Sequence, residues 1–210
     1  MIEKSWIEVP DEAMRTIRDT AARLRGEYML NIADRFGPVW AGGSIMRTLV
    51  KHVYNPDVDV DIFVPASLWH KGLESEDQAS LEPYVDVPGR GALLSSKRPP
   101  FNFIKMLDRN DTNFPMQVFA GFDFFASMVA TDGSFIYGHS KAFRDINRRM
   151  LVLQSRYWNM MNERSEDAVS NEWHARVVRQ RRRVFERAGK FQQQLGMKFD
   201  LLLHDPFEKH

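Results

Sequence analysis

Residues 39–64 read VWAGGSIMRTLVKHVYNPDVDVDIFV, and this stretch decides the fold. It opens with a short apolar run and continues through the pair Gly42-Gly43. Apolar residues then recur at helical spacing over residues 45–51, with Ser44 at the position of a helix N-cap. The stretch closes with an alternation of apolar residues and aspartates, whose period of two is typical of a strand. It therefore predicts a strand, a tight glycine turn, a short helix and a second strand.

The second strand, expected over residues 58–64, carries its carboxylates at every other position. Residues i and i+2 point to the same face of a strand, so Asp59 and Asp61 are expected about 6 to 7 Å apart at the backbone. Such a pair suits Mg²⁺ or Mn²⁺, because these ions bind carboxylate oxygens together with phosphates and water. Asp57 ranks below the other two, because the Asn-Pro pair before it indicates that the strand starts later. A solvated edge strand is the alternative explanation of the alternation.

The glycines add a phosphate-binding element to this pair. Gly42, Gly43 and Ser44 lie where a helix is expected to begin, and the free N–H groups and the dipole of a helix N-terminus favour an anionic phosphate. Glycine also lets a phosphate approach the backbone closely. A glycine turn followed by paired aspartates predicts phosphoryl chemistry with two metal ions, one acting on the attacking hydroxyl and one on the triphosphate.

A second charged feature lies near the C-terminus, on a long amphipathic helix. At 100° per residue its basic stripe consists of Arg176, Arg179, Arg183, Arg187 and Lys190. Its apolar stripe consists of Trp173, Val177, Val184, Ala188, Phe191 and Leu195. We expect the apolar stripe to dock on the rest of the protein and the basic one to remain free for an RNA backbone or a triphosphate. A basic stripe that is only solvated surface is the alternative.

Composition limits the remaining possibilities. The chain has 210 residues, 43% of them apolar and 27% charged, as in a packed globular protein. The absence of cysteine excludes thiol catalysis, cysteine metal sites and disulfides. The net charge of +1 gives no global argument for a nucleic-acid partner. Because no signal peptide and no apolar run of about 20 residues is present, we expect a cytoplasmic protein.

The pattern predicts the α+β class, with a small mixed sheet. The other expected elements are a helix over 10–36, an irregular surface insertion over 66–100, strands over 101–106, 116–119 and 122–130, and helices from 142 to about 194 with an interruption near 162–170. These elements divide into a mixed head over residues 1–140 and a helical neck and tail over residues 141–210.

The glycine turn followed by an Asp-x-Asp strand resembles the signature of the DNA polymerase beta-like nucleotidyltransferases. Within that superfamily the likeness is closest to the class II CCA-adding enzymes and bacterial poly(A) polymerases. Their glycine turn reads Gly-Gly-x-x-Arg-Asp, to which we match Gly42, Gly43 and Arg47, with Thr48 in place of the final Asp. Their metal strand reads Asp-x-Asp followed by apolar residues, as do residues 59–63.

Two further family motifs have weaker counterparts. The motif Arg-Arg-Asp-Phe-Thr-x-Asn resembles residues 122–127, where only Asp123 and Phe124 are retained. The resemblance makes Asp123 a candidate ribose contact or a third catalytic carboxylate, and the alternative is a structural aspartate between aromatic residues.

The last motif, Glu-Asp-x-x-Arg, lies in the family's helical neck, whose entry resembles residues 142–146. In the family its Asp and Arg contact the edge of the incoming base. The best match here is residues 172–176, followed by Arg179 and Arg182. Trp173 replaces the Asp, so a ring that can stack on a base stands where the family has a carboxylate acceptor.

The resemblance covers about residues 37–190, without the body and tail domains of the CCA-adding enzymes. It implies a metal-dependent transfer of a nucleoside monophosphate from an NTP to an acceptor hydroxyl, with release of pyrophosphate. The expected metal ligands are Asp59 and Asp61, and the expected nucleotide contacts are Gly42, Gly43, Ser44, Arg47, Arg176 and Arg179. The expected RNA contacts are Arg182, Arg183, Arg187 and Lys190.

The favoured acceptor is an RNA 3′ end, with tRNA as the first candidate. One alternative is an enzyme of the toxin or resistance type that modifies tRNA, a protein or a small molecule. The other alternative is a catalytically idle domain that binds nucleotide or RNA.

Overall fold

A computed structural model provides the structure of this chain. It describes residues 2–4, 11–12, 14–15, 18–19, 22, 39–52, 55, 57–65, 81–87, 90–95, 101–106, 114–131, 136–154, 157 and 171–199. Within these ranges, only the backbone is described for residues 2–4, 39–41, 81–87, 90–95, 101, 105, 114–116, 171–174 and 176.

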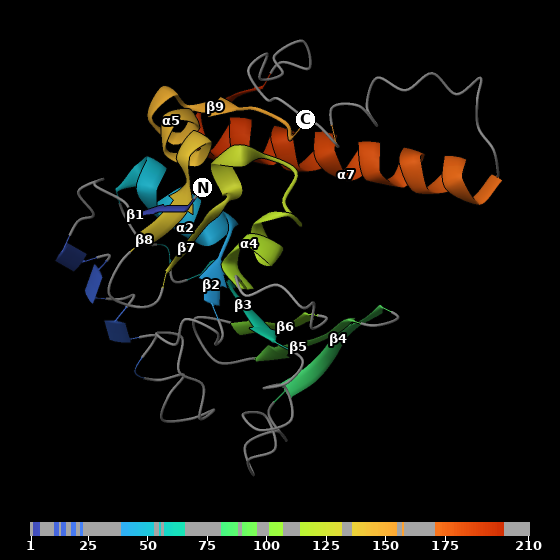
Figure 1. Cartoon of the computed structure of the whole chain (residues 1–210), viewed down its shortest axis with the longest axis horizontal. Helices are drawn as coiled ribbons and strands as arrows, with labels where there is room; N and C mark the ends of the chain where they lie inside the picture. Colours follow the sequence, from blue (N-terminus) through green and yellow to red (C-terminus); the bar gives the residue numbers. More distant parts are fainter. Residues whose placement is uncertain are drawn as a thin grey trace.

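The centre of the protein is one mixed sheet, which has eight strands among the described residues. In spatial order they are β1 (Ile2–Lys4), β8 (Ile136–His139), β7 (Val129–Thr131), β2 (Val39–Ala41), β3 (Val60–Pro65), β6 (Phe101–Met106), β5 (Arg90–Ser95) and β4 (Leu81–Val87). Strands β3 and β6 are parallel, whereas the other neighbours are antiparallel. Figure 1 shows β3 and β6 at the middle of the molecule, with the β5–β4 hairpin beyond them.

The helices lie beside the part of the sheet that contains β2, β7 and β8, away from the β5–β4 hairpin (Figure 1). They are α2 (Gly43–Lys51), α4 (Phe114–Phe119), the 3-10 helix η2 (Phe125–Ser127), α5 (Ser140–Arg148) and the long α7 (Asn171–Leu195). Strands β9 (Met150–Leu151) and β10 (Lys198–Phe199) form a separate parallel pair. The described part of the chain contains no helix that is long and apolar enough to span a membrane. The α+β class predicted from the sequence is confirmed.

Several predicted elements are confirmed, and others are wrong. The strands over 39–41 and 101–106 are present as β2 and β6. The strand predicted over 116–119 is helix α4, because a short apolar run does not distinguish a buried helix from a buried strand. The strand predicted over 122–130 is mostly a turn and η2, with strand geometry only from Val129 onward.

The predicted surface insertion over 66–100 is also wrong for its second half. Strands β4 and β5 lie there and extend the sheet as an antiparallel hairpin. A register shift between Pro83 and Val85 interrupts the alternation that would have indicated a strand. The described residues of the predicted N-terminal helix, 11–12, 14–15, 18–19 and 22, are helical, and the rest of that helix lies outside the described residues.

The hydrophobic core is continuous across residue 140. One cluster joins Met46 of α2 and Phe103 of β6 with Ile146 of α5 and Phe191 of α7. The apolar stripe of α7 is buried as predicted at Val177, Val184, Ala188, Phe191 and Leu195, while the side chain of Trp173 lies outside the description. Helix α7 is therefore packed on the sheet domain, and the boundary near residue 140 stays a prediction from the sequence.

Candidate active site

The glycine turn between β2 and α2 forms one wall of the candidate site. Gly42 has φ 94° and ψ −141°, a backbone conformation that side-chain-bearing residues rarely adopt. A Cβ atom at Gly42 would lie 3.1 Å from Cζ of Phe122, so the Phe122 ring would have to shift slightly to accept one. Gly42 is the N-cap of α2, and the prediction that Ser44 is the cap is wrong because the helix already begins at Gly43.

This start of α2 suits an anion. The N–H of Gly42 donates to the carbonyl of Val129 at 2.9 Å, which fixes the turn to β7. No side chain caps the helix, and the first turn carries no acidic residue. Gly43 and Ser44 line the cavity at this helix end. The positive end of the helix dipole is therefore directed at the cavity.

The two aspartates of the motif lie at the start of β3. The strand begins at Val60 rather than at residue 58, so Asp59 immediately precedes it and Asp61 is its second residue. Both aspartates line the same cavity, as the alternation predicts. Asp57 is exposed in the preceding turn and is not part of the cavity lining.

Strand β6 adds a polar group that the motif does not contain. Asn102 lies opposite Asp61 in the parallel register, and its Nδ2 donates to Oδ1 of Asp61 at 2.8 Å. The Oδ1 atom of Asn102 is buried and has no hydrogen-bond partner in the part of the chain that the structure describes. Two carboxylates and an unpaired amide oxygen are thus available at this wall.

The negative charges of Asp59 and Asp61 repel each other in the cavity. The pKa of Asp61 is raised to about 7, first by burial of its carboxyl group and second by the neighbouring charge of Asp59. The amide of Asn102 and the guanidinium groups of Arg187 and Arg47 act in the opposite direction. A cation between the two carboxylates would relieve this repulsion.

The carboxylates at this wall of the cavity suit a divalent ion. Among the described residues no group of three or more His, Asp or Glu side chains could hold a metal on its own. Asp59 and Asp61 nevertheless fit Mg²⁺ or Mn²⁺, because these ions are commonly held by one or two carboxylates while phosphates and water supply the other ligands.

Arg47 brings positive charge into the cavity from α2. Its guanidinium lies 5.6 Å from the centre of the Phe191 ring, and its Nε is buried without a hydrogen-bond partner among the described residues. Burial lowers the pKa of Arg47, although Asp59 and Asp61 raise it.

The match of Arg47 to the arginine of the family pattern is wrong by one residue. Counted from Gly42, the arginine of Gly-Gly-x-x-Arg-Asp corresponds to Met46, and Arg47 corresponds to the Asp. Met46 is fully buried in the core, whereas Arg47 lines the cavity. Only the Arg47 side chain of this pair therefore reaches the site.

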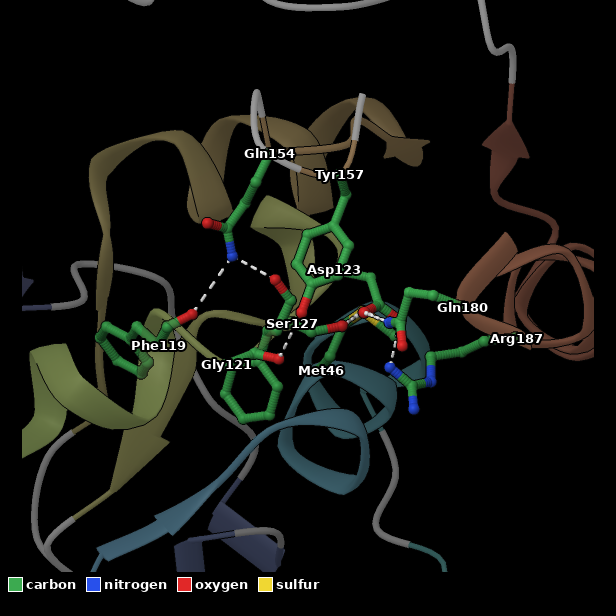
Figure 2. Close-up of polar contacts among 10 residues, drawn as sticks. Met46, Phe119, Gly121, Asp123, Ser127, Gln154, Tyr157, Gln180 and Arg187 are labelled. Atoms are coloured by element: carbon green, nitrogen blue, oxygen red, sulfur yellow. Dashed lines mark hydrogen bonds and ion pairs between the residues drawn. The ribbon is translucent and has the colours of Figure 1, made fainter. Parts of the chain in front are cut away.

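Asp123 has a different environment from the other two aspartates. Its side chain is 2% exposed, forms an ion pair with Arg187, and accepts a hydrogen bond from Nε2 of Gln180 at 3.2 Å. Figure 2 shows both α7 residues directed at this carboxylate. Asp123 is not part of the cavity lining, so these contacts make it a link between α7 and the sheet domain.

Hydrogen bonds from Gln154 and Tyr157 also hold the loop that carries Asp123 (Figure 2). Gln154 donates from Nε2 to the carbonyl of Phe119 at 3.3 Å and to the carbonyl of Phe122. The hydroxyl of Tyr157 donates to the carbonyl of Gly121 at 3.2 Å. These bonds satisfy backbone carbonyls of a loop whose conformation places Phe122 against the glycine turn.

The predicted basic stripe divides into three parts. Arg183, Arg187 and Lys190 line the cavity, as does Glu186, which the sequence analysis did not select. Arg179 is exposed and outside the lining, as is Arg182, a predicted RNA contact that is not in the stripe and that pairs with Glu186 at 2.7 Å. The side chain of Arg176 lies outside the described residues. The prediction that the whole stripe remains free is wrong at Arg187, because Asp123 attracts its guanidinium.

These groups meet in a cavity of about 560 Å³ between β3, β6, α2, α4 and α7. Its polar lining is Gly43, Ser44, Arg47, Asp59, Asp61, Asn102, Ser127, Arg183, Glu186, Arg187 and Lys190. Its remaining lining is Val58, Phe63, Ile104, Met106, Val118, Gly121, Phe122 and Phe191. Most of the charged members were predicted from the sequence. Asn102, Glu186 and Phe122 were not, because none of them has a fixed sequence spacing from the two aspartates.

Comparisons with known proteins find similar solved structures only. No protein-family model matches this chain, and a comparison with curated proteins finds no match. A CCA-adding enzyme of Thermotoga maritima in complex with tRNA is 14% identical, with a TM-score of 0.47, and the match covers 77% of this chain and 40% of that chain. A tRNA-processing enzyme in an apo form is 16% identical, with a TM-score of 0.49, over 92% of this chain and 45% of that chain.

A third similar structure is the CCA-adding enzyme of Bacillus stearothermophilus with CTP. It is 15% identical, with a TM-score of 0.39, over 68% of this chain and 32% of that chain. This chain therefore spans less than half the length of each of the three structures.

Proposed function

We propose that this protein transfers a nucleoside monophosphate from an NTP to an acceptor hydroxyl and releases pyrophosphate, in the presence of Mg²⁺ or Mn²⁺. The observation that carries the proposal is that Asp59 and Asp61 face the same cavity as the uncapped N-terminus of α2. A carboxylate pair beside an anion-binding helix end is suited to a metal-bound triphosphate.

In this proposal backbone N–H groups bind the phosphates, and cationic side chains neutralise their charge. Backbone N–H groups at Gly43 and Ser44 bind the terminal phosphates at the helix end. The cations Arg47, Arg187 and Lys190 neutralise the charge that builds up on the departing pyrophosphate. When bound, divalent ions activate the acceptor hydroxyl and stabilise the leaving group. Asp59 and Asp61 hold these ions, and Asn102 orients Asp61.

We propose RNA 3′ ends as acceptors, with tRNA as the first candidate. Arg179, Arg182 and Arg183 are exposed on α7, and Arg183 also lines the cavity, so positive charge extends from the site onto the surface. Clustered arginines attract a phosphate backbone without regard to its sequence. Arg176 belongs to the same proposal through its position in the helix sequence.

The experiment is incubation with each α-labelled NTP, Mg²⁺, total RNA and cell extract, followed by sizing of the labelled product. We expect label in RNA with the wild-type protein. We also expect a loss of at least 100-fold in Asp59→Asn and Asp61→Asn, because removal of a metal ligand disables the two-ion site. Asp57→Asn is the matched control, since Asp57 belongs to the same acidic run but lies outside the cavity.

The outcomes separate the alternatives. Label in protein or in a small molecule would indicate the toxin or resistance type of enzyme. Binding of RNA without any label transfer would indicate the idle domain. Equal activity in Asp57→Asn, Asp59→Asn and Asp61→Asn would refute the assignment of the carboxylates.

A further inference from the structure

The cavity has an apolar side that phosphate chemistry does not use. We call Phe63, Ile104, Met106 and Val118 the apolar floor. Phe63 belongs to β3, Ile104 and Met106 to β6, and Val118 to α4. Ile104 and Met106 are only partly buried, so their side chains remain accessible from the cavity.

The strand register places the apolar floor relative to the carboxylates. In the parallel β3–β6 pair Asp61 lies opposite Asn102, and Phe63 lies opposite Ile104. Met106 follows two residues further, so each step along the strand moves roughly 7 Å away from Asp61 on the same face. The antiparallel partner β2 pairs Trp40 with Ile62 and therefore runs toward the Asp61 end of β3.

The glycine turn follows β2 at that same end. Continued by two residues, the register sets Gly42 opposite Val60, so the glycine turn lies level with the two carboxylates, and the apolar floor lies further along β3 and β6. A polar half of the cavity thus passes into an apolar half with the reacting position between them.

This arrangement assigns a side to each reactant. In phosphoryl transfer the attacking and leaving oxygens lie roughly in line on opposite sides of the phosphorus. With the terminal phosphates at Gly43 and Ser44, pyrophosphate leaves toward the glycine turn, so the acceptor approaches from the apolar floor. The acceptor oxygen forms a bond to the α-phosphorus, the bond from that phosphorus to the bridging oxygen breaks, and the hydroxyl proton passes to solvent.

We propose that the apolar floor binds the 3′-terminal base of a single-stranded RNA acceptor. This inference rests on the proposed function and extends it to a subsite. Charge favours RNA over a protein acceptor, because Arg183 lines the cavity and Arg179 is exposed one turn earlier on α7, where a polyanion would neutralise both. The four floor side chains offer no hydrogen-bonding groups, so the subsite accepts any terminal base by apolar contact.

The test is a double-mutant cycle between protein and RNA, measured as binding with Mg²⁺ and without NTP. The two ligands are a short single-stranded RNA and the same RNA with an abasic 3′-terminal ribose. The protein change is Met106→Gln, which replaces a thioether by an amide of similar length at a partly buried position. Met106→Leu keeps the surface apolar, and Met150→Gln is the matched control at a partly buried methionine of β9, outside the cavity.

We expect wild-type protein to bind the complete RNA about 5- to 10-fold more tightly than the abasic RNA. In Met106→Gln this ratio falls to about 2 or less, whereas Met106→Leu and Met150→Gln retain it. Thermal unfolding of each variant checks that it is folded. An equal ratio in wild type and Met106→Gln, a ratio of one in wild type, or no binding of RNA would overturn the subsite.

Label transfer to the same RNA is measured separately. Labelled RNA with a ratio that does not depend on Met106 would leave the proposed function standing and overturn the subsite. A ratio that depends on Met106, without any labelled RNA, would support the subsite and overturn the transfer activity.

Discussion

The ion pair between Asp123 and Arg187 gives the strongest stability prediction. Asp123 is 2% exposed and the Arg187 side chain is 37% exposed, so the carboxylate depends on its partner more than the guanidinium does. In Arg187→Met the carboxylate keeps the hydrogen bond from Gln180 but loses the positive charge beside it. In Asp123→Asn the guanidinium that loses its partner still reaches water.

The magnitudes follow from this asymmetry. Removing one partner of a buried pair costs roughly 3–5 kcal/mol, and the exposure of Arg187 reduces this to about 2–3 kcal/mol for Arg187→Met. We expect about 1 kcal/mol for Asp123→Asn, because an amide still accepts a hydrogen bond and no buried charge is left. The double variant should cost little more than Asp123→Asn, which gives a coupling free energy of about 2 kcal/mol.

Urea unfolding of the four proteins at one pH measures these differences. Arg182→Met is the matched control on the same helix, because its pair with Glu186 has side chains that are 80% and 61% exposed. We expect no measurable change in the free energy of unfolding for that variant, because water screens an exposed ion pair. If Arg187→Met cost no more than Arg182→Met, the ion pair would not be what holds α7 against the loop at Asp123.

Three further predictions concern the carboxylates and the glycines. Because the folded pKa of Asp61, about 7, lies above its value of 3.8 in an unfolded chain, its contribution to stability is present below about pH 4 and is lost as pH rises through 7. In EDTA, Asp61→Asn should therefore unfold at higher urea than wild type at pH 8 and at nearly the same urea at pH 4; the opposite order would contradict the raised pKa. Mg²⁺ should raise the melting temperature of wild type at pH 8 and not that of Asp61→Asn, as calorimetry would show. Gly42→Ala should lower the free energy of unfolding by about 1–3 kcal/mol, because the φ of 94° and the nearby Phe122 ring both oppose a Cβ. Gly189→Ala in α7 has open space around the new Cβ and should raise the free energy of unfolding by about 0.5–1 kcal/mol in the same urea assay.

The elements that were predicted correctly depend on residues close together in the sequence. The glycine turn between β2 and α2 follows from Gly42 and Gly43, which permit a conformation closed to other residues. The common face of Asp59 and Asp61 follows from the two-residue period of a strand. The buried stripe of α7 follows from helical spacing, and all of its described apolar members are buried.

The missed features depend on contacts between distant segments. Asn102 reaches Asp61 across 41 residues, because β3 and β6 pair in parallel, and parallel pairing leaves no hairpin signal in the sequence. Arg187 reaches Asp123 across 64 residues, because α7 packs on the core. The β4–β5 hairpin was missed for a local reason, the irregular register at Pro83.

The sequence by itself thus determined the local geometry of the motif: a glycine turn at the start of a helix, followed by carboxylates at alternate positions of a strand, each defined by backbone preferences over a few residues. Only the tertiary structure decided what surrounds that motif. Burial raised the pKa of Asp61, strand pairing supplied Asn102 and the apolar floor, and the packing of α7 placed Arg187 and Lys190 in the cavity. These results arise from burial and long-range packing, which depend on how the whole chain closes on its core and leave no fixed spacing in the sequence.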